Sequence, residues 1–335
     1  MRAWRLHRPA PIESRPLACE ALADPVPGPG EVLLAVRMCG ICRTDLHVSE
    51  GELEVRRSPV VPGHQIVGTV LAVGRGVATL APGDRAGVAW LHRTCGVCGF
   101  CKSGRENLCP NADFTGWSVD GGFAEQAIAP AAFTYPLPAG FADRDAAPLL
   151  CAGIIGYRAL ALTGLGGFAG ARVGIYGFGA AGHVAIQLLR GRGAEVYVCT
   201  RDRNKHQPLA LELGATWVGD AAAPPPRPLD AAVVFAPAGE LVHAALTATE
   251  RGGSVVLGGI HMSDIPALPY HLLYGERVLR TVANNTRADG AAFLAEAARL
   301  PVRTHTELFP FSAANEALRA LKHDGIRGAG VLQVA

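Results

Sequence analysis

The spacing of hydrophobic and polar positions along this chain changes near residue 145. Before that point, short apolar and β-branched runs at residues 31–40, 64–74 and 83–91 are separated by Pro-Gly and Gly-Asp turn signals. Runs of this kind between turns are typical of strands. The first part of the chain is therefore predicted to be a β-rich, barrel-like unit.

Beyond residue 145, helical and strand-like segments alternate. Residues 146–164 have helical spacing, and four buried-strand patterns follow them. The strands are expected at residues 172–179, 194–200, 231–236 and 252–259, with helical runs such as 183–191 and 209–215 between them. This alternation predicts an α/β fold in which a doubly wound parallel sheet carries helices on both faces.

A chain of 335 residues is long for a single core, so two domains are expected. We place a β-rich domain at residues 1–147, the doubly wound domain at residues 148–286, and a return to the first domain at residues 287–335. Residues 311–335 predict a capped helix followed by a strand, and the prolines at 224–228 predict a surface loop.

Composition excludes several classes of protein. The formal net charge of +2 gives no bias toward nucleic acid or an anionic membrane surface. The first residues lack the pattern of a signal peptide, and every long apolar run contains Gly, Pro or charge, so no membrane span is expected. Nine cysteines, mostly clustered, favour the reducing cytoplasm.

One short segment carries four cysteines with the spacing C-x2-C-x2-C-x7-C. They are Cys95, Cys98, Cys101 and Cys109, within a lobe at about residues 92–112. Four thiolates this close together can complete a tetrahedral shell around one Zn²⁺, whereas buried free thiols or disulfides rarely repeat this spacing in a reduced protein. A closed shell has no open position, so this zinc is expected to be structural.

A glycine-rich motif marks a dinucleotide site. Gly177, Gly179 and Gly182 form a G-x-G-x-x-G that follows an apolar strand and opens a helix. The first glycine permits a tight turn, the second lets a pyrophosphate approach the backbone, and the third allows close packing of helix on strand. A plain glycine-rich turn is the alternative, and the strand–turn–helix context favours the cofactor.

A second group of metal-binding residue types is scattered over the first 151 residues. Cys42, His64 and Cys151 together offer two thiolates and one imidazole, which leaves one tetrahedral position open, as a catalytic zinc needs. Each residue alone has an ordinary structural interpretation, as a core cysteine or a histidine in a turn. Only the combination indicates a metal site.

The motifs form an ordered set through the whole chain: GICRTDLH, PGHQIVG, the cysteine lobe, DGGFAEQ, LLCAGIIGY and GFGAAG. In this order they resemble the zinc-dependent alcohol dehydrogenases of the medium-chain dehydrogenase/reductase superfamily, most of all the cinnamyl-alcohol-dehydrogenase-like branch. The resemblance implies a GroES-like catalytic domain, a Rossmann domain, two zinc ions per chain, and reversible hydride transfer between a primary alcohol and NAD(P), with aromatic and allylic alcohols as candidates.

The resemblance also implies the roles of residues around the first motif. Cys42, before Arg-Thr-Asp, would be the zinc ligand, and Cys39 three residues earlier remains an alternative. Thr44 would contact the substrate oxygen and pass on its proton, and His47 would extend this relay toward solvent.

Asp45 would accept a hydrogen bond from His64 and so fix the tautomer of that ligand. A purely structural alternative is that Thr44 and Asp45 cap a helix, and both roles can hold together.

Two positions depart from the family pattern. Gln65 follows His64 where relatives carry Glu, so no carboxylate is available there to compete for the metal. Ile155 stands one turn beyond Cys151, where many relatives place a Thr near the nicotinamide, and an isoleucine side chain cannot make the hydrogen bond of that Thr.

The end of the second Rossmann strand indicates the cofactor. Thr200 occupies the position at which NAD enzymes carry an acid for the ribose, and Arg201 and Lys205 follow it. These residues suit a 2′-phosphate, so NADP(H) is favoured over NAD(H), although Asp202 could serve NAD. Arg43 is assigned to the cofactor site as well.

The substrate is defined only as a small alcohol or aldehyde. An apolar pocket for it could be lined by Trp90, Leu91, His92 and Trp117, which could equally be core residues. A homo-oligomer, dimer or tetramer, is expected.

Two other functions fit these residues less well. A nucleic-acid-binding zinc ribbon would need a basic face, but the lobe holds only Arg93, Lys102 and Arg105. A zinc-free quinone or enone reductase of the same superfamily would not need the Cys42, His64 and Cys151 group.

Overall fold

The computed structural model describes residues 1–300 and 302–335 and divides the chain into two compact units. Unit 1 comprises Met1–Cys151, Asn284–Ala298 and Thr304–Ala335, and unit 2 comprises Ala152–Ala283 with Arg299–Arg303. Unit 1 is β-rich and unit 2 is built on a parallel sheet, so the predicted fold class is confirmed.

The main sheet of unit 1 runs in the order β16-β17-β3-β4-β5-β9, and β8 also pairs with β3. Its strands are β3 (Glu31–Ile41), β4 (Gln65–Val73), β5 (Arg85–Val88), β8 (Gln126–Pro130), β9 (Thr134–Pro136), β16 (Thr306–Pro310) and β17 (Ala329–Gln333). Only β16 and β17 pair in parallel. β3 alternates buried and half-exposed residues over most of its length, as expected for a strand with one face on a core.

Smaller elements complete unit 1. Two hairpin-like pairs are β1 (Arg2–Leu6) with β2 (Leu17–Ala21), and β6 (Leu91–Arg93) with β7 (Asp113–Phe114). The α-helices are α1 (Arg43–Glu50), α2 (Gly99–Lys102), α3 (Asp143–Ala146), α8 (Arg287–Arg299) and α9 (Ala314–Lys322). The 3₁₀ turns are η1 (Ile12–Ser14), η2 (Glu106–Leu108), η3 (Ala131–Phe133), η4 (Ala147–Leu150) and η6 (Phe311–Ala313).

The prediction of a capping side chain for the C-terminal helix is wrong. α9 begins after Ala313, whose methyl side chain cannot accept a hydrogen bond, and no side chain caps the helix. The preceding turn η6 leads directly into α9 instead.

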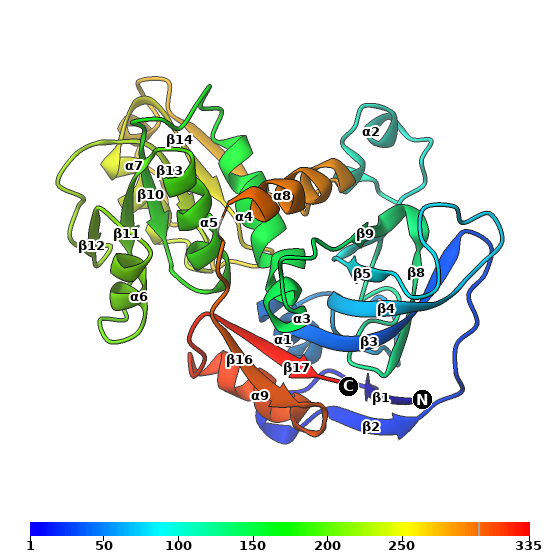
Figure 1. The fold of residues 1–335 in the computed structure, drawn as a ribbon. Helices are drawn as coiled ribbons and strands as arrows, with labels where there is room; N and C mark the ends of the chain where they lie inside the picture. The colour runs from blue at the N-terminus through cyan, green and yellow to red at the C-terminus, as the bar shows by residue number, and fades with distance from the viewer. Residues whose placement is uncertain (301) are drawn as a thin grey trace. The chain divides into compact units, whose positions relative to one another are not determined.

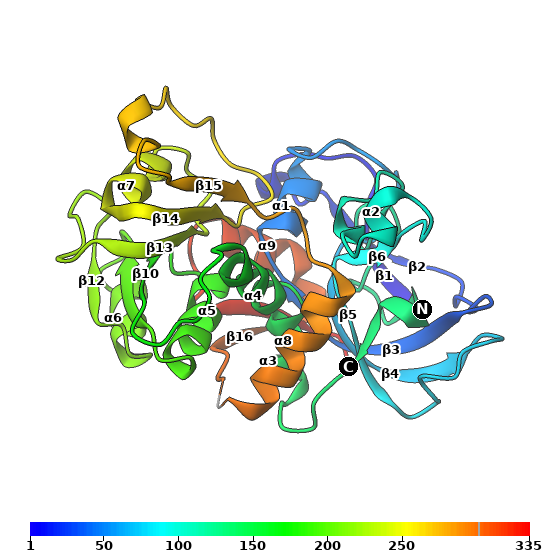
Figure 2. The same cartoon turned by 90° about the horizontal axis from the view of Figure 1, so that it is seen from above.

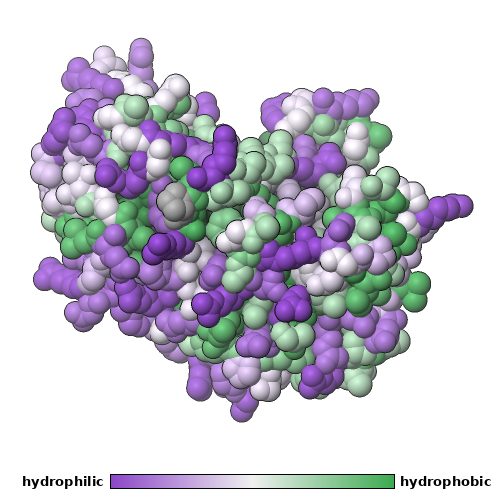
Figure 3. Space-filling view, viewed as in Figure 1, coloured by the Kyte–Doolittle hydropathy of each residue, from purple (hydrophilic) through white to green (hydrophobic). Residues whose placement is uncertain are grey.

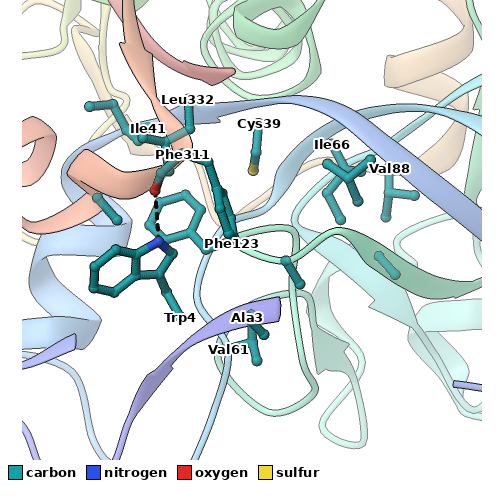
Figure 4. Close-up of a cluster of buried hydrophobic side chains, with 14 of the residues drawn as sticks. Ala3, Trp4, Cys39, Ile41, Val61, Ile66, Val88, Phe123, Phe311 and Leu332 are labelled. Carbon is teal, nitrogen blue, oxygen red and sulfur yellow. Dashed lines mark hydrogen bonds between the residues drawn. The ribbon is translucent and has the colours of Figure 1, made fainter. Parts of the chain in front are cut away.

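The core of unit 1 brings together distant parts of the chain (Figure 4). Phe123 and Ile66 are almost completely buried in it, and the Trp4 Nε1–H donates a hydrogen bond of 2.7 Å to the Phe311 carbonyl. Cys39 lies among these apolar side chains. The C-terminal segment is therefore an integral part of the N-terminal core.

Unit 2 holds a six-stranded parallel sheet in the order β12-β11-β10-β13-β14-β15. The strands are β10 (Arg172–Tyr176), β11 (Glu195–Cys199), β12 (Trp217–Gly219), β13 (Leu229–Val234), β14 (Thr249–Leu257) and β15 (Val278–Thr281). The four predicted strands are β10, β11, β13 and β14. The two edge strands, β12 and β15, are only three and four residues long and were not predicted.

Helices cover both faces of this sheet. They are α4 (Ala152–Leu162), α5 (Ala180–Gly191), α6 (His206–Glu212) and α7 (Leu241–Ala248), with the turn η5 (Tyr270–Leu272). α7 lies on one side of the strands and α5 and α6 on the other (Figures 1 and 2). The strand order reverses between β10 and β13, which is where doubly wound sheets bind ligands at their carboxyl edge.

The surface is mixed in character. In the view of Figure 3, hydrophilic and hydrophobic side chains alternate over the whole visible face. Within the described residues, no single helix is long and apolar enough to cross a membrane, and only the bent pair Asp143–Leu150 and Ala152–Leu162 together reaches that length and composition.

Candidate metal centres and dinucleotide site

The first motif folds into a capped helix start that presents a sulfur. Cys42 is the N-cap of α1 in an extended conformation, and its backbone N–H donates to Asp45 Oδ2 at 2.9 Å. The Thr44 N–H donates to Cys42 Sγ at 3.3 Å. The Asp three residues after the cap closes a capping box. The helix cap thus fixes the position of the Cys42 sulfur.

Cys42, His64 and Cys151 come together in unit 1. Cys42 Sγ lies 3.3 Å from His64 Nε2 and 4.0 Å from Cys151 Sγ, and the three ligand atoms all lie within 4.8 Å of one another. His64 is fully buried and Cys151 directly follows η4. Residues from three distant segments therefore form one compact donor set.

His64 is held in one orientation by Asp45. The His64 ring contacts Asp45 Oδ1 through Nδ1 at 3.0 Å, and the Gly63 N–H donates to the same oxygen at 3.2 Å. Gly63 has a φ of 95° and leaves no room for a side chain, since a Cβ would lie 2.4 Å from the Phe123 ring. A donated Nδ1 proton leaves Nε2 free to bind a metal.

The structure groups Cys42, and not Cys39, with the other two candidates. Cys39 belongs to β3 and is completely buried in the unit 1 core (Figure 4). Desolvation raises the pKa of its thiol well above the usual value, which suits an inert core cysteine. The alternation of the strand could not decide this, because Cys42 lies one residue beyond the end of β3.

The surroundings of Cys42, His64 and Cys151, called the trio below, favour a thiolate at Cys42. A hydrogen bond from Cys151 and the charge of His64 lower the Cys42 pKa well below its usual value. Burial opposes charge on His64, but the Asp45 carboxylate and the Cys42 thiolate outweigh it and raise the His64 pKa to about 10. Because zinc binds thiolates and the neutral imidazole, an ion at this position would take the place of the Nε2 proton that the surrounding negative charge retains.

The four-cysteine lobe forms the second donor set. The four sulfurs, contributed by Cys95, Cys98, Cys101 and Cys109, lie within 4.8 Å of one another. The Sγ–Sγ distances are 3.9 Å for Cys95–Cys101 and 3.5 Å for Cys98–Cys101. Tetrahedral Zn–S bonds of about 2.3 Å would place two sulfurs about 3.8 Å apart, so the lobe fits a Zn²⁺.

Backbone N–H groups prepare the lobe for a cation. The N–H groups of Val97 and Cys98 lower the pKa of the Cys95 thiol to about 6, whereas burial raises the pKa of Cys109 to about 11. Glycines 96 and 104, with φ of 72° and 70°, turn the chain around the sulfurs. The lobe therefore resembles a folded loop that a bound ion would hold closed.

The predicted relay residues both lie on α1. Thr44 is buried at the start of this helix, and its backbone N–H donates to Cys42 Sγ at 3.3 Å. His47 is also buried, and its Nδ1 bonds to the Glu52 carboxylate. Glu52 is partly exposed and was missed from the sequence, where only its spacing five residues after His47 could have indicated it.

Gln65 and Arg43 take structural positions. The Gln65 side chain is buried beside Gly40, where a Cβ would lie 2.6 Å from Gln65 Oε1, and its Nε2 has no hydrogen-bond partner within the described residues. The Arg43 guanidinium donates to Asp324 at 2.9 Å on the surface. Neither residue joins the trio, and Arg43 stays a prediction for the cofactor site.

In unit 2 the glycine motif forms the turn between β10 and α5. Gly177 has a φ of 89°, and a Cβ there would lie 2.7 Å from the Ala236 nitrogen. A Cβ on Gly182 would lie 2.8 Å from the Gly177 carbonyl, whereas the Cβ position of Gly179 faces open space. No side chain caps α5, so the backbone N–H groups at its start are available to a pyrophosphate.

The segment after β11 carries the predicted ribose-phosphate residues. Thr200 is buried, and Arg201 is exposed next to it. Asp202 is used in the turn: its Oδ1 accepts the N–H of Asn204 at 2.9 Å and of Lys205 at 2.7 Å. These bonds lower the pKa of Asp202 and keep its carboxylate directed at the backbone.

Comparisons with known proteins agree with this geometry. The family model of the alcohol dehydrogenase GroES-like domain matches residues 28–139, and that of the zinc-binding dehydrogenase matches residues 180–299. A probable alcohol dehydrogenase AdhA of Mycobacterium tuberculosis is 49% identical over 340 residues, covering 100% of this chain and 97% of the relative.

Two more distant relatives are also alcohol dehydrogenases. An alcohol dehydrogenase of Geobacillus stearothermophilus is 36% identical and covers 96% of this chain and 97% of its own length. The structure of a cinnamyl alcohol dehydrogenase from Sorghum bicolor superimposes with a TM-score of 0.88 at 27% identity, over 99% of this chain and 97% of the other.

Metal analysis would distinguish the two donor sets. We expect two zinc ions in the unsubstituted chain and one in Cys42→Ala, with little change in thermal stability because unit 1 keeps its core. Cys98→Ala should also lose one zinc, and its Tm should fall by about 5 °C or more, because the apolar cluster at the lobe is small, with Leu91, Cys109, Ala112 and Phe133 as its buried members. Cys39→Ala is the matched control and should keep both ions. Loss of zinc from Cys39→Ala but not from Cys42→Ala would contradict the assignment.

Proposed function

Because the chain belongs to the zinc-binding alcohol dehydrogenases of the medium-chain dehydrogenase/reductase superfamily, we propose that it is a zinc-dependent enzyme that interconverts primary alcohols and aldehydes with NADP(H). The observation that carries this proposal is the three-residue donor set, Cys42, His64 and Cys151, with Thr44 bonded through its backbone N–H to the Cys42 sulfur. Three protein ligands leave one tetrahedral position for a substrate oxygen.

The residues divide into two metal sites. The trio would hold the catalytic zinc and the four cysteines of the lobe would hold the structural one. When bound, the catalytic zinc supplies Lewis-acid stabilisation of the negative charge on the reacting oxygen. Asp45 keeps the His64 ring in place, because its carboxylate accepts a hydrogen bond from the Nδ1–H within the protein interior.

The proton of the alcohol leaves through side chains of α1. The hydroxyl of Thr44, two residues after Cys42, would accept the proton from the substrate oxygen while passing on its own. His47 and the Glu52 carboxylate, which are bonded to each other, would complete the path because Glu52 reaches the surface. In aldehyde reduction the same groups return a proton to the oxygen.

The glycine motif of unit 2 supports the redox half of the reaction. NADP(H), when bound, supplies or accepts the hydride. The open space at Gly179 and the uncapped start of α5 suit its pyrophosphate. The 2′-phosphate would be bound by Thr200, Arg201 and Lys205, since Thr200 brings no negative charge to this position.

The engagement of Asp202 supports the preference for NADP(H). Its carboxylate already accepts two backbone N–H groups, so it is poorly placed to bind both ribose hydroxyls of NAD. Arg201 is exposed and no ion pair within the described residues uses it. A broad-specificity NAD(H)-dependent alcohol dehydrogenase is the alternative.

The substrate class is proposed from the aromatic residues near the trio. The Trp90 and His64 rings lie edge to face with centroids 4.9 Å apart. An alcohol with its oxygen at the open position beside His64 would therefore bring its carbon chain close to Trp90. This favours aromatic or allylic primary alcohols, whose flat apolar groups pack on an indole.

We expect a homo-oligomer with a second copy of this chain against the β15 edge. β15 is an edge strand, and no strand within the described residues pairs with its outer side. Val278 on the strand and Tyr270 and Tyr274 before it are 38%, 75% and 66% exposed. A group of exposed apolar side chains at an open strand edge is typical of a surface that another chain covers.

Replacement of Thr44 tests the proton path. Thr44→Val keeps the shape of the side chain and removes the hydroxyl, so turnover should fall about a hundredfold or more at neutral pH, as expected for a general acid–base group. Ser49→Ala removes another buried hydroxyl of α1, bonded to the Asp45 carbonyl, and should keep most of the activity. Equal turnover of Thr44→Val and unsubstituted enzyme from pH 6 to 9 would limit Thr44 to a structural role.

Cofactor choice is tested by steady-state kinetics with NADP and NAD. The unsubstituted enzyme should prefer NADP by roughly ten- to a hundredfold in kcat/KM, the value of one bidentate charge-assisted contact. Thr200→Asp with Arg201→Ile should reverse the preference, by repulsion of the phosphate and loss of a donor. Arg203→Ile, at an exposed neighbour, is the control. A preference of the unsubstituted enzyme for NAD would show that Asp202 serves the ribose.

The oligomeric state is tested by measuring, by sedimentation, the mass of a variant that carries a charged residue on β15. Val278→Lys should shift the chain toward monomer, because the buried β15 edge would receive an unpaired charge. Leu308→Lys on β16, an edge strand of unit 1 and 42% exposed at that residue, is the matched control and should leave the mass unchanged. A monomer before any substitution would refute the expectation.

A further inference from the structure

Three aromatic rings form a cluster next to the Cys42, His64 and Cys151 group. Trp90 contacts His64, with ring centroids 4.9 Å apart, and stacks on Trp117 at 5.6 Å with an interplanar angle of 14°. Phe114 lies 5.4 Å from Trp90 and 5.5 Å from Trp117. This aromatic cluster, Trp90, Phe114 and Trp117, links a metal ligand to the surface.

A single cation covers the outer side chains of the aromatic cluster. The Cζ atom of Arg56 lies 4.2 Å from the centroid of the Trp117 ring and 5.4 Å from that of Phe114. Both distances are within the range of a cation–π interaction, and Trp and Arg form the strongest pairs of this kind. The Arg56 Nη1 also donates a long hydrogen bond of 3.5 Å to the Ala112 carbonyl.

Arg56 and Trp117 tie a loop to the cluster. The loop, residues 51–58, leaves the end of α1, and the Trp117 Nε1–H donates to the Glu54 carbonyl at 2.8 Å. Most of its side chains are exposed, and Val55 is 52% exposed. A small cavity of about 10 Å³, enough for about one water, remains between the loop and the body of unit 1.

The middle of the loop depends on these aromatic contacts for its position. The other ties are at its ends: the Glu52 N–H donates to the His47 carbonyl, the Arg57 side chain pairs with Asp120, and Ser58 Oγ donates to the His7 carbonyl. Loss of the Arg56 charge would therefore loosen residues 54–56 and the outer face of Trp117 together, while the ends of the loop stay attached.

We propose that Arg56 is a positioning residue that sets a preference for alcohols carrying a flat ring, because it holds Trp117, and through it Trp90, as a rigid wall beside the reacting carbon. The inference rests on the proposed function. A ring attached near the alcohol carbon would pack on Trp90, whose ring stacks with Trp117 and Phe114 and meets the His64 ring edge to face. Ethanol is too short to use such a wall, so it serves as an internal reference.

The test compares cinnamyl alcohol with ethanol in the zinc-loaded full chain. In Arg56→Gln the ratio of the two kcat/KM values should fall about threefold to tenfold, the scale of one cation–π contact, mainly through a higher KM for cinnamyl alcohol. Arg56→Lys keeps a cation and should restore most of the ratio. The control Arg105→Gln removes a cation from Phe100 of the lobe, where Cζ lies 5.4 Å from the ring, and should leave the ratio unchanged.

A spectroscopic readout separates positioning from a direct contact with substrate. The near-ultraviolet circular dichroism of the stacked Trp90 and Trp117 should decrease in Arg56→Gln and recover in Arg56→Lys. An unchanged substrate ratio in Arg56→Gln, a lowered ratio with an unchanged dichroism signal, or an equal fall in Arg105→Gln would each overturn the inference. If the unsubstituted enzyme oxidises no alcohol with either cofactor, the proposed function itself fails, and the substrate preference fails with it.

Discussion

The buried carboxylate of Asp45 is the group on which the arrangement of the candidate catalytic site depends. Its two oxygens contact the backbone N–H groups of Cys42 and Gly63 and the Nδ1 of His64. One side chain thus fixes the start of α1, the turn before β4 and the ring of His64, a proposed metal ligand. Burial raises the pKa of Asp45, and only these partners make its charge tolerable inside the protein. The same set of hydrogen bonds lets Asp45 cap the helix and orient the His64 ring.

The sequence predicted those parts of the molecule that short contiguous patterns determine. The cysteine lobe, the glycine turn and the four inner strands of unit 2 lie where their spacing placed them. The short edge strands escaped prediction because three or four residues carry no usable periodicity. The choice between Cys39 and Cys42 needed the structure, since only the end of β3 decides which sulfur leaves the core. Glu52 and Arg56 were missed because loop residues meet their partners through tertiary contacts.

Charge is arranged differently in the two units. In unit 1, buried charges stand in a network around the trio, so each one is compensated by a neighbour. In unit 2, the Asp202 carboxylate accepts backbone hydrogen bonds in the turn after β11, while the Arg201 side chain is exposed. An acidic residue at the expected distance from a glycine motif therefore predicts NAD binding only if its carboxylate is not already hydrogen-bonded within the protein. The same residue type can define a ribose site in one chain and a turn in another.

The two donor sets also differ in how much chain must be organised before a metal can bind. Cys95 and Cys109 are 14 residues apart, whereas Cys42 and Cys151 are 109 apart. Closing the longer loop costs about 2 kcal/mol more in chain entropy. The lobe can therefore capture its ion while the ribosome is still extending the chain, but the trio can form only after Cys151 has emerged and β3, β4 and η4 have packed. If both sets bind zinc as proposed, the ion of the lobe would bind before the ion of the trio during synthesis, and limiting zinc would yield chains that are folded but not yet active.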